Sequence, residues 1–94
     1  MMKDEMAWEK FRKFQNYGSA DSLNFYGCVN EEGVWFDSAT SFDVAAHWCC
    51  YAYNQFDLTN EQEIEWMNTE GMRLGLSIIH GSMIKRLYEA GLIK

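Results

Sequence analysis

The spacing of apolar residues predicts a helix over residues 3–17. Its apolar stripe recurs at the three- and four-residue intervals of a helix and consists of Ala7, Trp8, Phe11 and Phe14. Acidic residues come near the start of the segment and basic residues near its end, which is the order that the helix dipole favours. A glycine follows at position 18, so we expect the helix to end there, with a loop over residues 19–22.

The pattern changes to alternation over residues 23–37, which predicts a β-hairpin. In an extended strand, Phe25 and Val29 would point to one side, and Tyr26 and Cys28 to the other. An Asn-Glu-Glu-Gly segment follows and is a plausible turn, since its glycine can take a positive φ. Two strands alone are marginally stable, so we expect this hairpin to pack against a helix or to gain a strand from a partner.

Two apolar stripes run along residues 41–56 and predict a second helix, which Ser41, or Thr40 together with Asp43, would cap. The first stripe consists of Phe42, Ala45, Ala46, Cys49, Tyr53 and Phe56. The second consists of Val44, His47, Trp48 and Tyr51. A helix that is apolar on most sides is typical of the buried centre of a fold, so we expect both stripes to be core. The alternative is that the second stripe is exposed and binds something.

Residues 60–90 again have helical spacing, and Thr59 with Gln62, or Asn60 with Glu63, matches a capping box. Each glycine within the segment lowers helix stability by about 1 kcal/mol relative to alanine. We therefore expect a break near residues 68–71, which gives two helices. Gly91 would end the last helix in a Schellman arrangement.

These elements predict an α+β fold that is mainly helical, with one β-hairpin at about 23–37 packed against three or four helices. A chain of 94 residues, 48% of them hydrophobic, suits a single compact domain over 1–94. The sequence contains no apolar stretch long enough to span a membrane and no apolar signal-peptide core, so we expect a cytoplasmic protein. Its three cysteines do not indicate a disulfide framework.

The sequence contains no established catalytic or metal-binding motif, so we expect no enzyme activity, no cofactor and no metal site. His47 and His80 fall on separate predicted helices, where a lone histidine is more often structural than catalytic. His47 and Cys50, one helical turn apart, could ligate a zinc ion, although the neighbouring Cys49 projects about 100° away from Cys50. The simpler interpretation is that the cysteines are small buried thiols.

Charge distribution carries the strongest functional signal. The net charge is −6, and residues 14–72 contain ten acidic residues but no lysine or arginine. Helix caps, the helix dipole and a Glu70–Arg73 pair explain some of these acids. The hairpin tip and the segment from Asp57 to Glu70 are not explained in this way, and aromatic residues lie among them. The predicted partner-binding residues are Glu31, Glu32, Trp35, Asp37, Asp57, Glu61, Glu65, Trp66 and Glu70.

Such a surface repels phosphate backbones and attracts basic protein surfaces, so we expect no direct contact with nucleic acid or membrane. The first hypothesis is a non-enzymatic inhibitor or regulator that occupies the basic nucleic-acid-binding surface of a partner protein. Small size, acidity and the absence of catalytic motifs are shared with phage anti-defence proteins such as anti-CRISPR and anti-restriction proteins. This similarity is one of general character and transfers no residue roles.

An alternative hypothesis is a small-ligand module that binds a nucleotide-like ring on Trp48 or Tyr51. In it, Arg73, Lys85 or Arg86 would meet a phosphate, in a pocket between the second and last helices. Gly71 and Gly75 also resemble a close-packing motif, which makes a homodimer possible.

Overall fold

The computed structural model describes residues 23–94, so the predicted helix at 3–17, its end at Gly18 and the loop at 19–22 lie outside the described residues. The described elements are β1 (Tyr26–Val29), β2 (Trp35–Ala39), α2 (Phe42–Ala52), α3 (Asn60–Trp66), the π-helical segment η2 (Met67–Gly71), β3 (Ser77–His80) and α4 (Gly81–Glu89). None of the helices within residues 23–94 is long and apolar enough to cross a membrane.

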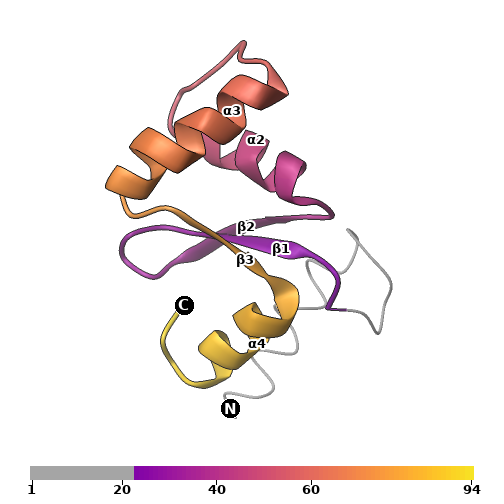
Figure 1. The fold of residues 1–94 in the computed structure, drawn as a ribbon. Coiled ribbons are helices and arrows are strands. Elements are labelled where there is room, and N and C mark those ends of the chain that lie inside the picture. Colours follow the sequence, from indigo (N-terminus) through magenta and orange to yellow (C-terminus); the bar gives the residue numbers. More distant parts are fainter. Residues whose placement is uncertain (1–22) are drawn as a thin grey trace.

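The three strands form one antiparallel sheet in the order β2-β1-β3, with β1 in the centre (Figure 1). Tyr26 pairs with Ala39 on one side and with His80 on the other. The α+β class is therefore confirmed, and the hairpin is completed by a third strand. That strand comes from this chain itself.

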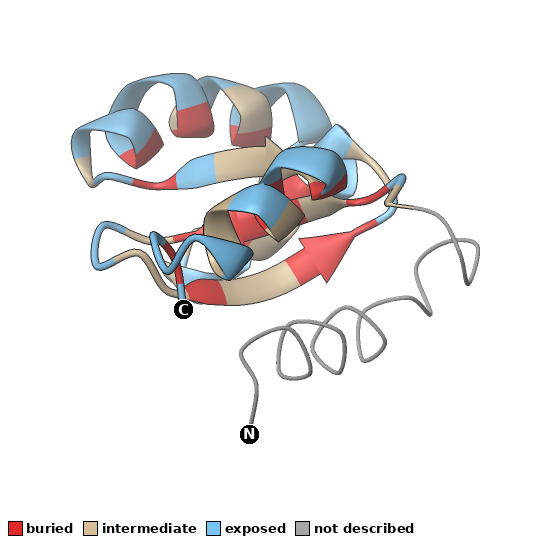
Figure 2. Cartoon of the chain, turned by 90° about the horizontal axis from the view of Figure 1, so that it is seen from below, coloured by how far each residue is buried: buried red, intermediate tan, exposed pale blue. Residues whose placement is uncertain are grey.

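The sheet separates two helical layers. On one face lie α2 and α3 with η2, and on the other lies α4 (Figure 1). Each face has its own apolar cluster: Phe25, Val29, Trp35 and Ile84 belong to the α4 side, whereas Cys28 belongs to the α2–α3 side. Buried residues accordingly line the strands and the sheet-facing sides of the helices, while the outer sides are exposed (Figure 2).

The alternation predicted for the hairpin is confirmed, because Phe25 and Val29 pack in one cluster and Tyr26 and Cys28 in the other. The predicted turn is also confirmed. Oδ1 of Asn30 accepts hydrogen bonds from the backbone nitrogens of Glu32 and Val34 at 2.9 and 3.0 Å. Gly33 takes a φ of +76°, a conformation that glycine adopts without a steric cost.

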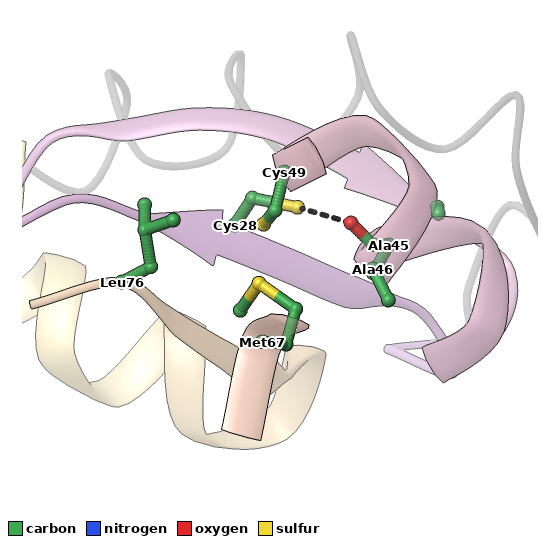
Figure 3. Close-up of a cluster of buried hydrophobic side chains, with 7 residues drawn as sticks. Cys28, Ala45, Ala46, Cys49, Met67 and Leu76 are labelled. Atoms are coloured by element: carbon green, nitrogen blue, oxygen red, sulfur yellow. Dashed lines mark hydrogen bonds between the residues drawn. The ribbon is translucent and has the colours of Figure 1, made fainter. Parts of the chain in front are cut away.

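The α2–α3 layer approaches the sheet closely because its contact side carries small residues. Ala45, Ala46 and Cys49 of α2 face Cys28 of β1, and all four are fully buried (Figure 3). The Sγ atom of Cys28 donates to the backbone oxygen of Ala45 at 3.5 Å. The helix begins at Ser41, whose hydroxyl accepts from the backbone nitrogen of Val44 at 3.3 Å.

The segment predicted to be helical throughout contains a strand. The π-helical turn η2 occupies the place of the expected break, but the helix continues beyond it and ends at Gly75, which has a φ of +82°. Residues 77–80 then pair with β1. The apolar residues Leu76, Ile78 and Ile79 are compatible with a helix or with a strand. They form a strand because this segment pairs with β1, which is distant in the sequence.

Helix α4 begins directly after β3. His80 is its N-cap, and its Nδ1 accepts from the backbone nitrogen of Ser82 at 3.3 Å. The predicted end of the helix is confirmed: Gly91 has a φ of +80°, and the backbone nitrogen of Leu92 donates to the oxygen of Leu87 at 2.9 Å. The structure thus gives His80 a capping role.

Candidate functional site

Helix α3 carries the best-defined part of the acidic surface. A capping box fixes its start: Thr59 Oγ1 accepts from the backbone nitrogen of Gln62 at 3.2 Å, and Gln62 Oε1 accepts from that of Thr59 at 2.8 Å. With the helix anchored there, Glu61 and Glu65 lie one turn apart and are exposed to solvent. Within residues 23–94 neither makes an ion pair. This part of the surface therefore retains its negative charge.

One side of α3 forms an open groove in which a carboxylate and an aromatic ring lie together. The groove has a volume of about 260 Å³ and is lined by Gln55, Leu58, Gln62, Glu65, Trp66 and Thr69. Tyr53 packs against the Trp66 ring, with the two ring centroids 5.9 Å apart. Thr69 Oγ1 donates to the backbone oxygen of Glu65 at 2.8 Å, which ties η2 to α3. A carboxylate beside a ring can bind a guanidinium by ion pairing and cation–π contact.

The hairpin tip adjoins the far end of the α3–η2 segment. A Cβ placed on Gly75 would come within 2.7 Å of the Cβ of Glu31, so the tip packs directly against the link between η2 and β3. Figure 1 places the β1–β2 turn and the end of η2 at the same end of the molecule. Glu31 and Glu32 are both exposed. The hairpin tip thus contacts the chain at Gly75, just beyond the helical segment that carries the second group of acids.

Glu70 differs from the other acids because it has a basic partner. Its Oε2 accepts from Nη2 and Nε of Arg73 at 2.6 and 2.9 Å. This contact raises the pKa of the Arg73 guanidinium. The pairing expected from the sequence is confirmed, and it compensates the negative charge of Glu70 locally.

Three further residues of the predicted set occupy different environments. Asp57 is exposed, in a left-handed conformation with a φ of +61°. Asp37 is half-buried, and its Oδ1 accepts from the backbone nitrogen of Ser38 at 2.8 Å. Trp35 has only 2% of its surface exposed, so its inclusion among the partner-binding residues is wrong. Its ring packs in the core on the α4 side of the sheet, because β2 turns this position inward.

The structure also shows a polar contact that sequence reasoning missed. Glu63 lies in the first turn of α3, where the helix dipole favours an acid, but it is only 5% exposed. Its Oε2 lies 2.6 Å from Nδ1 of His47, and its backbone oxygen accepts from Cys50 Sγ at 3.7 Å. These contacts join α3 to α2. The sequence holds no local signal for them, because 16 residues separate His47 from Glu63.

The second apolar stripe of α2 is largely exposed, so the expectation that both stripes are core is wrong. Val44, His47 and Tyr51 face solvent, and Trp48 is half-buried. Only one side of α2 contacts the sheet, and α3 lies beside α2 instead of covering it (Figure 1). The alternative geometry, with an exposed second stripe, is the one observed.

The rings of the small-ligand hypothesis and two of its three bases lie on opposite faces of the sheet. Trp48 packs with the α2–α3 cluster, whereas Lys85 and Arg86 belong to α4 on the opposite face of the sheet (Figure 1). The expected pocket between α2 and α4 is therefore blocked by the sheet. The predicted close-packing motif of Gly71 and Gly75 is also absent. Gly75 lies beyond the helical segment that contains Gly71, so the two glycines do not share one helix face.

Among residues 23–94, no three histidine, cysteine or acidic side chains come together to hold a metal ion. The three thiols are free and fully buried. Burial, followed by the charges of Glu63 and Cys49, raises the pKa of Cys50 to about 11. A hydrogen bond with Cys49 and burial raise the pKa of Cys28. Both effects suppress the reactive thiolate.

We expect the thiols of the native protein to react with a disulfide reagent at pH 8 at least about 100-fold more slowly than those of the urea-unfolded chain, because reaction requires local opening. The measurement is the release of thionitrobenzoate with and without urea. Free cysteine in the same urea provides the control for the reagent. Rapid modification of native Cys49 or Cys50 would contradict the buried packing.

No family model, curated protein or solved structure matched this chain in the comparisons with known proteins.

Proposed function

We propose that this chain is a non-enzymatic inhibitor or regulator that occupies the basic nucleic-acid-binding surface of a partner protein. The observation that carries the proposal is the α3 surface, where Glu61 and Glu65 are exposed and Glu65 shares a groove with Trp66. Basic clefts that bind nucleic acid are rich in arginine. A carboxylate beside an indole ring is suited to the same side chain.

Charge placement supports the same proposal. The α2–α3 layer, from residue 42 to residue 75, contains six acidic residues and one base, Arg73, which is paired with Glu70. The bases Lys85 and Arg86 belong to α4, beyond the sheet. One side of the domain therefore presents negative charge to an approaching partner, which accelerates association with a basic surface at low salt.

Neutralising the α3 carboxylates tests this function. The double variant Glu61→Gln, Glu65→Gln keeps the shape of both exposed side chains and removes their charges. We expect it to bind the partner about tenfold more weakly, since two exposed ion pairs contribute up to about 1 kcal/mol each. The matched control is Glu89→Gln, which removes an exposed carboxylate from α4.

The partner is first captured with the wild-type domain at about 50 mM salt, where screening is weak. Each purified candidate is then titrated with labelled nucleic acid in the presence and absence of the domain. We expect the wild-type domain to displace the nucleic acid, and the complex to dissociate at about 500 mM salt. A ternary complex, or binding that salt does not weaken, would refute the proposed function.

A further inference from the structure

Four neighbouring rings lie along α2 and the loop that follows it, three of them exposed and one half-buried. We name His47, Trp48, Tyr51 and Phe56 the α2 aromatic face. Tyr51 is 56% exposed and Phe56 is 50% exposed. The ring centroids of Tyr51 and Phe56 lie 4.9 Å apart, those of His47 and Trp48 5.2 Å apart, and those of Trp48 and Tyr51 6.3 Å apart. Exposed rings gathered in this way mark an interaction surface.

Contacts beneath the surface hold this face in place. His47 is fixed from below by Glu63, with 2.6 Å between Nδ1 and Oε2. Trp48 packs against the apolar cluster of the α2–α3 layer with part of its ring outward. Tyr51 meets Phe56 edge to face at an interplanar angle of 72°. Rings held by their neighbours lose little conformational freedom when a partner binds.

Acidic residues lie next to the α2 aromatic face. Asp43 lies one helical turn before His47, Asp57 directly follows Phe56, and Glu63 contacts His47. Asp43 and Asp57 are both exposed. The first base after β1 along the described chain, Arg73, is engaged by Glu70. An occupant that carries positive charge is therefore attracted to this face by the exposed carboxylates of Asp43 and Asp57.

A second copy of this chain is a poor occupant of the same face. Each copy has a net charge of −6, so the acidic borders of two such faces would repel one another. Four half-exposed side chains also offer only a few hundred Å² of surface, since a whole aromatic side chain buries about 150–250 Å². A stable interface buries about 800 Å² on each partner. Charge and area both favour a basic segment over self-association.

We propose that the α2 aromatic face is a second docking surface, which binds an arginine-bearing segment of a basic partner protein. The guanidinium stacks on the rings of Tyr51 and Phe56, while the bordering carboxylates neutralise its charge. Arginine is preferred over lysine because its planar head stacks on a ring and is more weakly hydrated than an ammonium. The proposal does not require the partner to bind nucleic acid.

The test uses a nona-arginine peptide as the probe and a nona-lysine peptide of equal charge as its comparison. Both are titrated into the full-length chain at about 150 mM salt while the tryptophan indole N–H signals are recorded by NMR. Single Trp→Phe variants assign the signals of Trp35, Trp48 and Trp66. We expect nona-arginine to shift the Trp48 signal saturably and more strongly than nona-lysine does, with the buried Trp35 signal unchanged.

The variant Tyr51→Ala, Phe56→Ala removes two rings that are at least half exposed. We expect it to weaken nona-arginine binding at Trp48 about fivefold or more, because each exposed cation–π contact contributes about 0.5–1 kcal/mol. Leu92→Ala is the matched control, since Leu92 is an apolar residue with 68% of its surface exposed and lies three residues after the end of α4. Tyr51→Leu keeps an apolar side chain and is expected to lose the preference for arginine over lysine.

The outcomes separate this inference from the proposed function. A shift at Trp66 without one at Trp48 overturns the inference and leaves the α3 surface in place. A shift at Trp48 without one at Trp66 supports the inference and counts against the α3 groove. Equal responses to both peptides, or an unchanged affinity in the double variant, overturn the arginine-docking inference. If the Trp48 signal shifts with protein concentration without any peptide, and sedimentation shows dimers, the occupant of this face is a second copy of the chain. That outcome overturns the arginine-docking inference.

Discussion

Gly81→Ala is expected to lower the free energy of unfolding by about 3 kcal/mol, at the upper end of the cost of overpacking a core. A Cβ at this position would lie 2.3 Å from the backbone oxygen of Leu23 and 2.6 Å from a ring carbon of Phe25. The first of these is a backbone atom, so no rotamer change can relieve the clash. Helix α4 would have to move away from β1, which would break the 2.7 Å hydrogen bond from the Gly81 nitrogen to the Phe25 oxygen.

Gly71→Ala is the matched control, because it also places a Cβ on a buried glycine in a helical segment. There the nearest atom is the Sδ of Met67 at 3.0 Å, on a flexible side chain that can shift. Alanine also favours the helix by about 1 kcal/mol over glycine. We expect a net change within about 1 kcal/mol. Urea unfolding followed by tryptophan fluorescence measures both variants, and equal losses would contradict the close approach of α4 to β1.

Trp35→Phe is expected to lower the free energy of unfolding by about 3 kcal/mol. Its indole Nε1 donates to the Ser38 hydroxyl at 2.9 Å and to the Asp37 backbone oxygen at 3.1 Å. Ser38 is fully buried, so removal of this donor leaves its hydroxyl without that hydrogen bond. An unsatisfied buried polar group lowers the free energy of unfolding by about 1–3 kcal/mol. The smaller ring also leaves a cavity beside Phe25 and Tyr88, whose ring centroids lie 6.0 and 5.9 Å from that of Trp35.

Trp48→Phe provides the comparison, because the Nε1 of Trp48 is buried and has no hydrogen-bond partner among residues 23–94. Phenylalanine removes this unsatisfied donor, which offsets the packing lost with the larger ring. We expect a change of less than about 1 kcal/mol. Thermal unfolding should separate the variants, since 3 kcal/mol corresponds to a fall in Tm of about 12 °C or more for a domain of this size. Similar Tm values would contradict the different roles of the two indoles.

The candidate site was only partly predictable from the sequence. The absence of bases showed that Glu61 and Glu65 would carry uncompensated charge, and the capping box placed them at the start of a helix. Neither the charge distribution nor the capping box indicated that Glu63 is buried while Glu61 and Glu65 are exposed. Burial of a carboxylate depends on a partner, and here the partner is His47 on another helix. Likewise, Trp35 and Trp66 both lie near acids in the sequence, but only Trp66 lines a groove.

Local patterns by themselves determined the hairpin with its turn at Gly33, the helix starts at Ser41 and Thr59, and the end of the last helix at Gly91. Each depends on residues within a few positions of one another, because turns and caps are formed by near neighbours.

Tertiary structure alone decided the features that join distant segments. It made residues 77–80 a strand by pairing them with β1, and it placed α3 beside α2, so that the α2 aromatic face remained exposed. It also brought Glu31 of the hairpin tip against Gly75, at the end of the helical segment that follows α3. An apolar stripe shows that a residue can be buried, and only the packing of the whole chain determines whether another element covers it.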